Sequence, residues 1–314
     1  METILITGGT GLVGKALTKQ LIERGYQVII LTRKKIDSVQ QSTDKNVENK
    51  LCYAFWDVEN KIMDKWAIEK ADHIIHLAGA NVFDQRWTKK YRTTILDSRT
   101  KTGELLLQYL SSTTNQLKSF ISASAIGWYG PDKGSNAFVE TDVADKNFLG
   151  ETCSAWEKSV EKINDLKKRL VILRIGIVLS KDGGAFVEFK KTIPYGIASI
   201  LGNGKQIISW IHIEDLCRAF IKSIEDTRMS GVYNAVAPMP ISNKELILQI
   251  AKKIRKSFYI PIYIPSFLLK LILGERSIEI LKSTTVSSKK LKDSDFTFLY
   301  PDIDSAISDL LNKH

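Results

Sequence analysis

The sequence predicts an α/β protein with a doubly wound parallel sheet, followed by a smaller, mostly C-terminal α/β lobe. Two observations carry this prediction. Apolar segments of strand length alternate with helical patterns from about residue 3 to residue 175. From Gly176 onward, glycines and prolines such as Gly183 and Pro194 interrupt shorter elements. We therefore expect a main domain at residues 1–175 and a smaller lobe at 176–314, with about 205–235 returning to the main domain.

The expected elements follow one another regularly along the first part of the chain. After the first strand and its helix, strands are expected at residues 27–31, 51–56, 73–77, 120–124 and 170–175, and long helices at 88–110 and 148–164. Each such alternation forms a βαβ unit, and successive units place helices on both faces of a parallel sheet. In the second part, 207–213 is a candidate returning strand and 267–273 a helix. Ligands should bind at the carboxyl ends of the strands.

Composition places the chain among soluble globular proteins, since 25% of its 314 residues are charged and 44% hydrophobic. The first strand begins at about Thr3 and leaves no room for a signal peptide. The most apolar stretch, Phe258 to Leu273, is interrupted by Pro261, Pro265 and Lys270, so it is too short and broken to span a bilayer.

The positions of the cysteines and lysines indicate where the protein works and which partners it binds. The three cysteines are scattered, with no metal spacing and no even set for disulfides, which favours a reducing, cytoplasmic location and no metal site. The net charge of +10 is compatible with nucleic-acid binding, but pairs such as Lys252-Lys253 lack interleaved aromatic residues. We expect a solvated lysine-rich surface, a small-molecule substrate, no nucleic-acid or membrane partner, and a monomer or homodimer.

The segment Thr7-Gly8-Gly9-Thr10-Gly11-Leu12-Val13-Gly14 joins the first strand to the first helix. Gly8 allows a tight turn, Gly11 lets the backbone approach a pyrophosphate, and Gly14 lets helix and strand pack closely. This context favours a Rossmann-type dinucleotide site over an ordinary glycine turn. The expected cofactor-binding residues near the first and fourth strands are Thr7, Gly8, Thr10, Gly11, Leu12, Val13, Gly14, Leu77, Ala78, Gly79 and Arg99.

The end of the second strand points to the phosphorylated cofactor, NADP(H). An NAD-selective site usually has an acidic residue there, whereas this chain has Thr32, Arg33 and Lys34. An arginine suits a 2′-phosphate through charge-assisted hydrogen bonds, although a solvated basic loop is the alternative. Asp57, with Val58 after the third strand, could accept from the adenine amino group or act as a turn residue.

Several motifs resemble the extended short-chain dehydrogenase/reductase superfamily. They include the glycine segment, His76-Leu77-Ala78-Gly79-Ala80, Ser122-Ala123-Ser124-Ala125-Ile126-Gly127-Trp128-Tyr129-Gly130 and Leu173-Arg174-Ile175-Gly176. Further segments resemble an atypical NAD-dependent epimerase/dehydratase-like branch, the "epimerase family protein" group with its own C-terminal domain. These are Arg86-Trp87, Ser98-Arg99, Phe148-Leu149, Cys153, Trp156-Glu157 and 273–301. The resemblance implies an oxidoreductase or nucleotide-sugar-epimerase-like activity.

The resemblance also implies that the usual catalytic pair is missing. The superfamily uses a tyrosine and a lysine four residues apart, whose positions hold Leu149 and Cys153 here. Leucine has no proton to exchange, and a neutral thiol is not a cation. Ser124 matches the serine that contacts substrate, and Arg99 stands where asparagine is common.

The candidates for the catalytic site are therefore Ser124, Tyr129, Arg99 and Cys153. Three of them also have a structural interpretation: Ser124 as a strand-end hydroxyl, Tyr129 as a buried aromatic residue and Cys153 as a packed cysteine. His212 could act as an acid or base, or simply satisfy buried polar groups. Asp215 is expected to cap the helix that follows. Two functions remain open: an NADP(H)-dependent enzyme with a nonstandard proton donor, and a non-catalytic NADP(H)-binding sensor or partner-binding protein.

Overall fold

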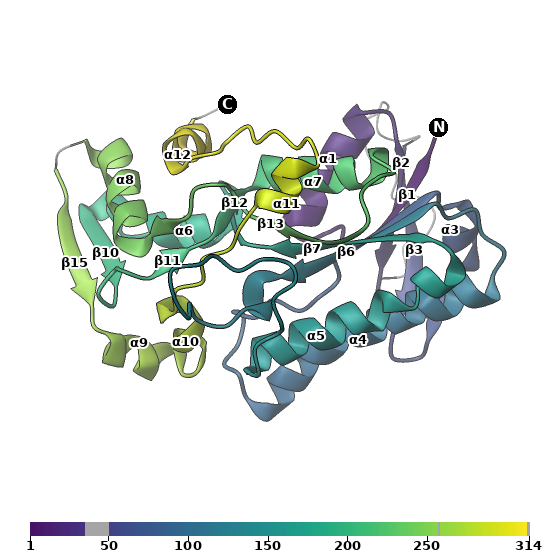
Figure 1. The fold of residues 1–314 in the computed structure, drawn as a ribbon, viewed down its shortest axis with the longest axis horizontal. Helices are drawn as coiled ribbons and strands as arrows, with labels where there is room; N and C mark the ends of the chain where they lie inside the picture. The colour runs from purple at the N-terminus through teal and green to yellow at the C-terminus, as the bar shows by residue number, and fades with distance from the viewer. Residues whose placement is uncertain (35–49, 257, 313–314) are drawn as a thin grey trace.

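The computed structural model describes residues 1–34, 50–256 and 258–312, and it has the α/β architecture predicted from the sequence (Figure 1). The first part forms an eight-stranded sheet in the order β13-β7-β6-β5-β1-β2-β3-β4. All neighbouring strands pair in parallel except the short β4, which is antiparallel to β3. The predicted doubly wound fold class is confirmed.

Six strands of the large sheet lie within two residues of their predicted positions: β1 (Thr3–Thr7), β2 (Gln27–Thr32), β3 (Leu51–Asp57), β5 (His73–His76), β6 (Ser119–Ala125) and β7 (Arg169–Ile175). The other two, β4 (Ile62–Met63) and β13 (Gly231–Ala235), were not predicted as strands. The central strands are apolar throughout, and β1 is buried at all five positions, because helices cover both faces of the sheet.

Two groups of helices enclose this sheet. Residues of α1 (Leu12–Glu23) and α7 (Ile213–Glu225) share one hydrophobic core with one face. Residues of α3 (Lys65–Lys70), α4 (Lys89–Ser112) and α5 (Phe148–Glu161) share another core with the opposite face. The paired α4 and α5 run side by side along the lower edge in Figure 1.

The second part builds three small sheets beside the carboxyl ends of the large one. Its strands are β8 (Ile177–Ser180), β9 (Gly183–Gly184), β10 (Ile197–Leu201), β11 (Ile207–Ile208), β12 (Trp210–His212), β14 (Ile241–Ser242) and β15 (Ile260–Ile264). Its helices are α6 (Ala185–Lys190), α8 (Asn243–Arg255), α9 (Ser266–Leu273), α10 (Arg276–Leu281), α11 (Lys289–Asp293) and α12 (Ile303–Leu311).

The chain returns to the large sheet through β13, which pairs with β7. The candidate returning strand at 207–213 instead divides between β11 and β12, which pair with β14 and β8. The exact division into domains stays a prediction.

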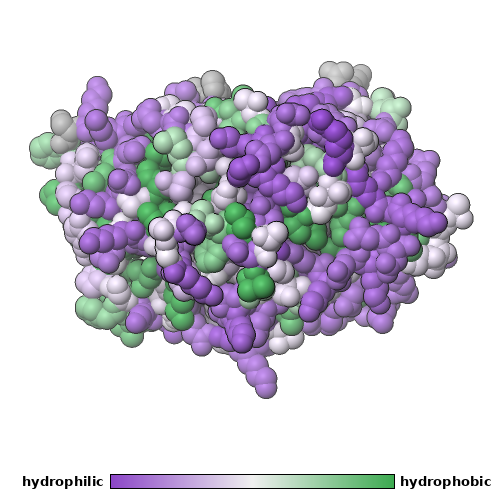
Figure 2. All heavy atoms as spheres, viewed as in Figure 1, coloured by the Kyte–Doolittle hydropathy of each residue, from purple (hydrophilic) through white to green (hydrophobic). Residues whose placement is uncertain are grey.

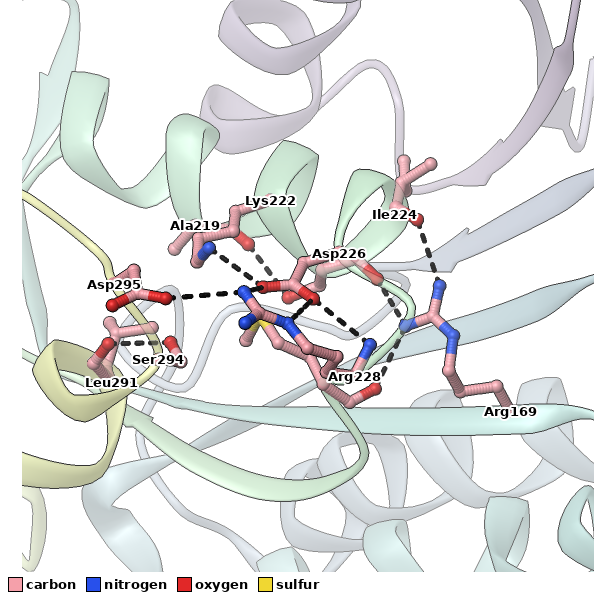
Figure 3. Close-up of polar contacts among 11 residues, drawn as sticks. Arg169, Ala219, Lys222, Ile224, Asp226, Arg228, Leu291, Ser294 and Asp295 are labelled. Carbon is pink, nitrogen blue, oxygen red and sulfur yellow. Dashed lines mark hydrogen bonds and ion pairs between the residues drawn. The ribbon is translucent and has the colours of Figure 1, made fainter.

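A polar network fastens the segment before β13 (Figure 3). Asp226 accepts hydrogen bonds from Lys222 and Arg228, and Arg228 also reaches Asp295 beyond α11. Arg169 of β7 donates to the carbonyl oxygens of Ser223, Ile224 and Met229. These contacts close the end of α7 and connect it to the C-terminal segment.

Candidate functional site

The glycine turn after β1 leaves an open cradle at the start of α1. Gly8 has φ +71°, and its carbonyl accepts from the Gly11 N–H at 3.0 Å. A Cβ on Gly14 would collide with the backbone of Gly8 and Gly9, whereas one on Gly11 would meet only the Gly8 oxygen, at 3.3 Å. Gly8 and Gly14 are therefore required by packing, and Gly11 faces open space where a pyrophosphate could approach the backbone.

The turn after β5 lies directly against this cradle. A Cβ on Gly8 would be 2.9 Å from the carbonyl carbon and oxygen of Leu77. From β1 the chain first adds β2 and β3 on one side of β1, and it then adds β5, β6 and β7 on the other side. The strand order therefore reverses between β1 and β5, and this gap is the topological switch point of the sheet. Open α/β sheets bind their ligands in this crevice.

Thr7 and His76 hold the turn after β5 in place through hydrogen bonds. The Thr7 hydroxyl accepts from the N–H groups of Leu77 and Ala78, both at 3.1 Å, and lies 2.8 Å from Nδ1 of His76. Burial lowers the pKa of His76 to about 4, so its ring is neutral and Nδ1 accepts a hydrogen bond from the Thr7 hydroxyl. The Thr7 side chain is thus committed to the turn and does not face the crevice.

The basic residues predicted to select the cofactor lie at the neighbouring strand end. Arg33 and Lys34 are exposed after β2, and Lys34 N–H donates to the Thr32 hydroxyl. Neither basic side chain forms an ion pair with another residue of the described ranges. Asp57 closes a turn through hydrogen bonds from the backbone and side chain of Asn60, which lower its pKa. The turn role of Asp57 is therefore realised in the structure.

Arg99 and Ser98 hold the Gly79–Ala80 segment from α4. Arg99 Nη1 donates to the Ala80 carbonyl at 3.0 Å, and the Ala80 N–H donates to Ser98 Oγ at 2.9 Å. The Arg99 guanidinium also stacks on Trp156 of α5, with 4.9 Å from Cζ to the ring centre. In the described residues, Arg99 has no carboxylate partner. It brings a positive charge to the edge of the crevice.

Ser124, the residue before the last of β6, belongs to a buried ionic cluster. Its hydroxyl donates to Glu157 Oε1 of α5 at 2.7 Å. Arg174 of β7 donates to both oxygens of Glu157, from Nε at 2.8 Å and Nη2 at 3.0 Å. The two charged side chains are only 3% and 10% exposed, so each neutralises a charge that would otherwise be costly to bury.

Tyr129 belongs to the far side of this cluster. Its side chain is fully buried, and its hydroxyl contacts Arg174 Nη1 at 3.0 Å and Asn234 Oδ1 at 2.8 Å. Burial raises the pKa of Tyr129 above its usual value of 10. The structure therefore connects Tyr129 to Ser124 only through Arg174 and Glu157, and this geometry does not favour Tyr129 as a base.

Leu149 and Cys153 both face the turn after β6. A Cβ on Gly127 would lie 3.3 Å from Leu149 Cβ and 3.6 Å from Cys153 Sγ. Burial raises the pKa of the Cys153 thiol to about 11, so the thiol is neutral at physiological pH. The structure places Cys153 near Arg99 but gives it no nucleophilic character.

His212 has a structural role at the start of α7. Its Nδ1 accepts from the N–H of Glu214 and caps α7, while Nε2 lies 3.3 Å from Asp309. Asp215, expected from the sequence to cap this helix, instead accepts from the backbone N–H groups of Leu299 and Tyr300. That expectation was wrong because the buried carboxylate is needed to anchor the C-terminal segment.

Three arginines join the chain around the start of α4 to the C-terminal lobe. Arg86 donates to the carbonyl oxygens of Leu271 and Ile272 at the end of α9, and Arg276 donates to Phe83 at 2.6 Å. Arg92 pairs with Glu275, and its guanidinium lies over Phe148. Arg86 and Phe83 precede α4 and Arg92 lies in its first turn, so these contacts join the start of α4 to α9 and α10.

Sequence reasoning missed Glu157 as the partner of Ser124, and the contacts of Arg86, Arg92 and Arg276. The available signal was a pair of opposite charges, Glu157 and Arg174, at positions where apolar helix and strand patterns predict burial.

The surface also has two polar recesses, one of about 290 Å³ beside Arg218 and Asp295 and one of about 310 Å³ beside Asp226 and Asp295. Neither is lined by the glycine turn, and both lie away from the carboxyl ends of the strands, so neither is the candidate site.

The sheet order and the glycine cradle define a Rossmann-type dinucleotide-binding protein. A family model described as the NAD dependent epimerase/dehydratase family matches residues 4–235, and the domain of unknown function DUF1731 matches 264–310. The chain therefore belongs to the NAD dependent epimerase/dehydratase family, and the resemblance found in its motifs is confirmed.

Individual relatives match along the whole chain. Epimerase family protein SSP1921 of Staphylococcus saprophyticus is 33% identical over 315 residues, covering 99% of this chain and 100% of the relative. The crystal structure of human epimerase family protein SDR39U1 with NADPH is 25% identical, with a TM-score of 0.86 and 98% of both chains covered. A nucleoside-diphosphate sugar epimerase from Corynebacterium glutamicum is 31% identical, with a TM-score of 0.75, covering 99% of this chain and 58% of that one.

Proposed function

We propose that this chain is an NADP(H)-dependent oxidoreductase or nucleotide-sugar-epimerase-like enzyme that acts on a small molecule. The observation that carries the cofactor choice is Arg33, an exposed guanidinium at the end of β2 without an ion-pair partner in the described residues. A 2′-phosphate would supply that partner. The structure of the similar human protein was determined with NADPH, which supports the same choice.

The residues present fit a dinucleotide. The space beside Gly11 and the uncapped start of α1 suit a pyrophosphate, and the Leu77–Gly79 turn borders the same crevice. Leu12, Val13, Thr10 and the backbone of Gly8 complete the proposed cradle. When bound, the nicotinamide would accept or deliver a hydride.

Ser124 would orient the substrate. Its single proton is donated to Glu157, so its oxygen lone pairs can accept a hydrogen bond from a substrate hydroxyl. The charge of Arg99 would stabilise negative charge near Gly79, but an arginine cannot act as the base. Leu149, the neutral thiol of Cys153 and the buried Tyr129 supply no ordinary proton relay, and this favours the alternative of a non-catalytic NADP(H) sensor or partner-binding protein.

Calorimetric titration of Arg33→Ala with NADPH and NADH tests the cofactor choice. Loss of a partly exposed charge-assisted contact of about 1.5–3 kcal/mol should weaken NADPH roughly ten- to a hundredfold and leave NADH unchanged. Lys65→Ala, which removes an exposed charge from α3, is the matched control. Equal losses for the two cofactors would show that Arg33 does not contact the 2′-phosphate.

The enzyme proposal predicts turnover of a substrate, whereas the sensor proposal predicts cofactor binding without turnover. On a carbonyl substrate found by screening, the enzyme proposal expects Ser124→Ala to lower kcat, and Tyr129→Phe to act chiefly through stability. Rebuilding the usual relay with Leu149→Tyr and Cys153→Lys gives an independent check. Tight NADPH binding with no turnover on any substrate, in wild type and rebuilt variant alike, would favour the sensor.

A further inference from the structure

One end of the C-terminal lobe exposes large apolar side chains on two adjacent elements. Figure 2 shows hydrophobic residues at the left end of the molecule, where Figure 1 places β15 and α9. We call this the β15–α9 surface, and its main exposed residues are Tyr195, Phe258, Ile260, Ile262, Phe267 and Leu271. Their exposed fractions range from 41% to 83%. Large exposed apolar side chains gathered at one end of a polar molecule are typical of an interaction site.

The strand pairing explains why β15 exposes its isoleucines. β15 pairs in parallel with β10, so that Ile260 and Ile262 are opposite Ile197 and Ser199. The intervening residue Ala198 is buried in the core that includes residues of α8. Because side chains alternate between the two faces of a strand, Ile260 and Ile262 lie on the face away from that core.

Helix α9 continues the apolar surface. Its eight residues are Ser-Phe-Leu-Leu-Lys-Leu-Ile-Leu, and Leu269 alone is buried. Phe267 and Leu271 are four positions apart, so they share one helix face, and they are 72% and 71% exposed. A surface helix normally turns polar residues outward, so this outward face lacks a partner in the isolated chain.

The same part of the chain is basic. Residues 246–274 contain Lys252, Lys253, Arg255, Lys256 and Lys270, and no aspartate or glutamate. Lys253 pairs with Asp304, whereas the other four cations have no carboxylate partner in the part of the chain that the structure describes. Arg255 donates to the carbonyl oxygens of Pro194 and Phe258, which places its charge between the two ends of the apolar surface at Tyr195 and Phe258.

Acidic residues bordering the surface are already neutralised. Glu188 pairs with Lys191, Glu279 with Lys282, and Glu275 with Arg92. The β15–α9 surface therefore combines exposed aromatic and aliphatic groups with unpaired positive charge. This combination binds anionic bilayers, since apolar side chains enter the headgroup region and each nearby lysine or arginine is attracted to the lipid charge.

A second copy of the chain fits the surface less well. A two-fold contact would bring four unpaired cations against four others, which is repulsive. Addition of a strand from a second copy is also hindered. The N–H of Ile260 donates to the Gly196 carbonyl, and N–H groups alternate in direction along a strand, so the next residue, Pro261, faces the free edge of β15. Because proline has no N–H, a donor is missing at this edge.

We propose that the β15–α9 surface docks this protein on an anionic lipid surface. No helix in the described residues is long and apolar enough to cross a membrane. Surface docking needs no such helix, so the proposal departs from the sequence-based expectation of no membrane partner. It does not involve the cofactor cradle and stands independently of the proposed function.

Sedimentation with lipid vesicles tests the proposal on the full-length protein. The protein should pellet with vesicles of phosphatidylcholine and phosphatidylglycerol at low salt, and much less with phosphatidylcholine alone or at high salt. Lys256→Glu with Lys270→Glu should lower the partition coefficient at least about thirtyfold, since each of the two lost positive charges accounts for about fivefold. Lys158→Glu with Lys162→Glu, an equal charge change at an exposed position of α5 and at its exposed C-cap, should have a much smaller effect.

Apolar variants separate docking from simple charge attraction. Phe267→Ser with Leu271→Ser should weaken vesicle binding strongly, whereas Val143→Ser with Leu299→Ser, which also removes exposed apolar groups, should not. Absence of binding to anionic vesicles at low salt would overturn the proposal. So would equal losses in the control variants, or a stable dimer that Phe267→Ser with Leu271→Ser dissociates without any lipid binding.

Discussion

The buried pair of Glu157 and Arg174 predicts a large effect from removing one charge. Glu157 receives three hydrogen bonds, one from Ser124 and two from Arg174, at 2.7 to 3.0 Å. Glu157→Gln keeps the side-chain volume but leaves a guanidinium that is 3% exposed without its counter-charge. Removing one partner of a buried pair costs about 3–5 kcal/mol, so the free energy of unfolding should fall by that amount.

The controls rank the contributions within the cluster. Ser124→Ala removes one hydrogen bond to a charged group and should cost about 1.5–3 kcal/mol. Glu161→Gln, an exposed position one turn later on α5, should stay within about 0.5 kcal/mol of wild type. Replacing both charges, Glu157→Leu with Arg174→Met, should cost less than Glu157→Leu alone because no unpaired charge remains.

Urea unfolding followed by tryptophan fluorescence measures these differences. The Trp128 ring lies 3.6 Å from Arg174 Cζ, so one of the six tryptophans of the chain is in contact with the cluster. A Glu157→Gln protein within about 1 kcal/mol of wild type would refute the reasoning, because it would mean that the guanidinium finds solvent or another partner at little cost.

Three further predictions follow from the cradle and its surroundings. Gly11→Val should abolish dinucleotide binding in a folded protein, whereas Gly14→Val should lower the melting temperature, because only the second added side chain collides with backbone. Unchanged NADPH affinity in folded Gly11→Val would place the cofactor elsewhere. The lowered pKa of His76, about 4, contributes stability above its unfolded value of 6.5 that is lost as the pH falls toward 4. Between pH 8 and 5 this amounts to about 2 kcal/mol, and His76→Gln should lose that part of the acid sensitivity in pH-dependent unfolding. Iodoacetamide followed by mass mapping should label the exposed Cys52 and spare Cys153, whose thiol is buried with a pKa of about 11; rapid labelling of Cys153 in the native protein would contradict its assigned environment.

The sequence by itself determined six of the eight strands of the main sheet, all but β4 and β13. Runs such as Ile4-Leu5-Ile6 are short, rich in β-branched residues and apolar at consecutive positions, which is typical of a strand covered on both faces, and the helical patterns between them favour parallel order. The glycine spacing predicted the turn and close packing that Gly8 and Gly14 show. These features are local, because backbone sterics and side-chain periodicity act within a few residues.

Only the tertiary structure decided what the polar side chains at the strand ends contact. Tyr129 follows the same strand as Ser124, yet its hydroxyl meets Asn234, 105 residues away. Ser124 donates to Glu157 of a later helix. Beyond a strand end, the alternation of side chains no longer fixes direction, and buried polar groups turn to whichever partner satisfies them. That partner comes from distant segments that only the folded chain brings together.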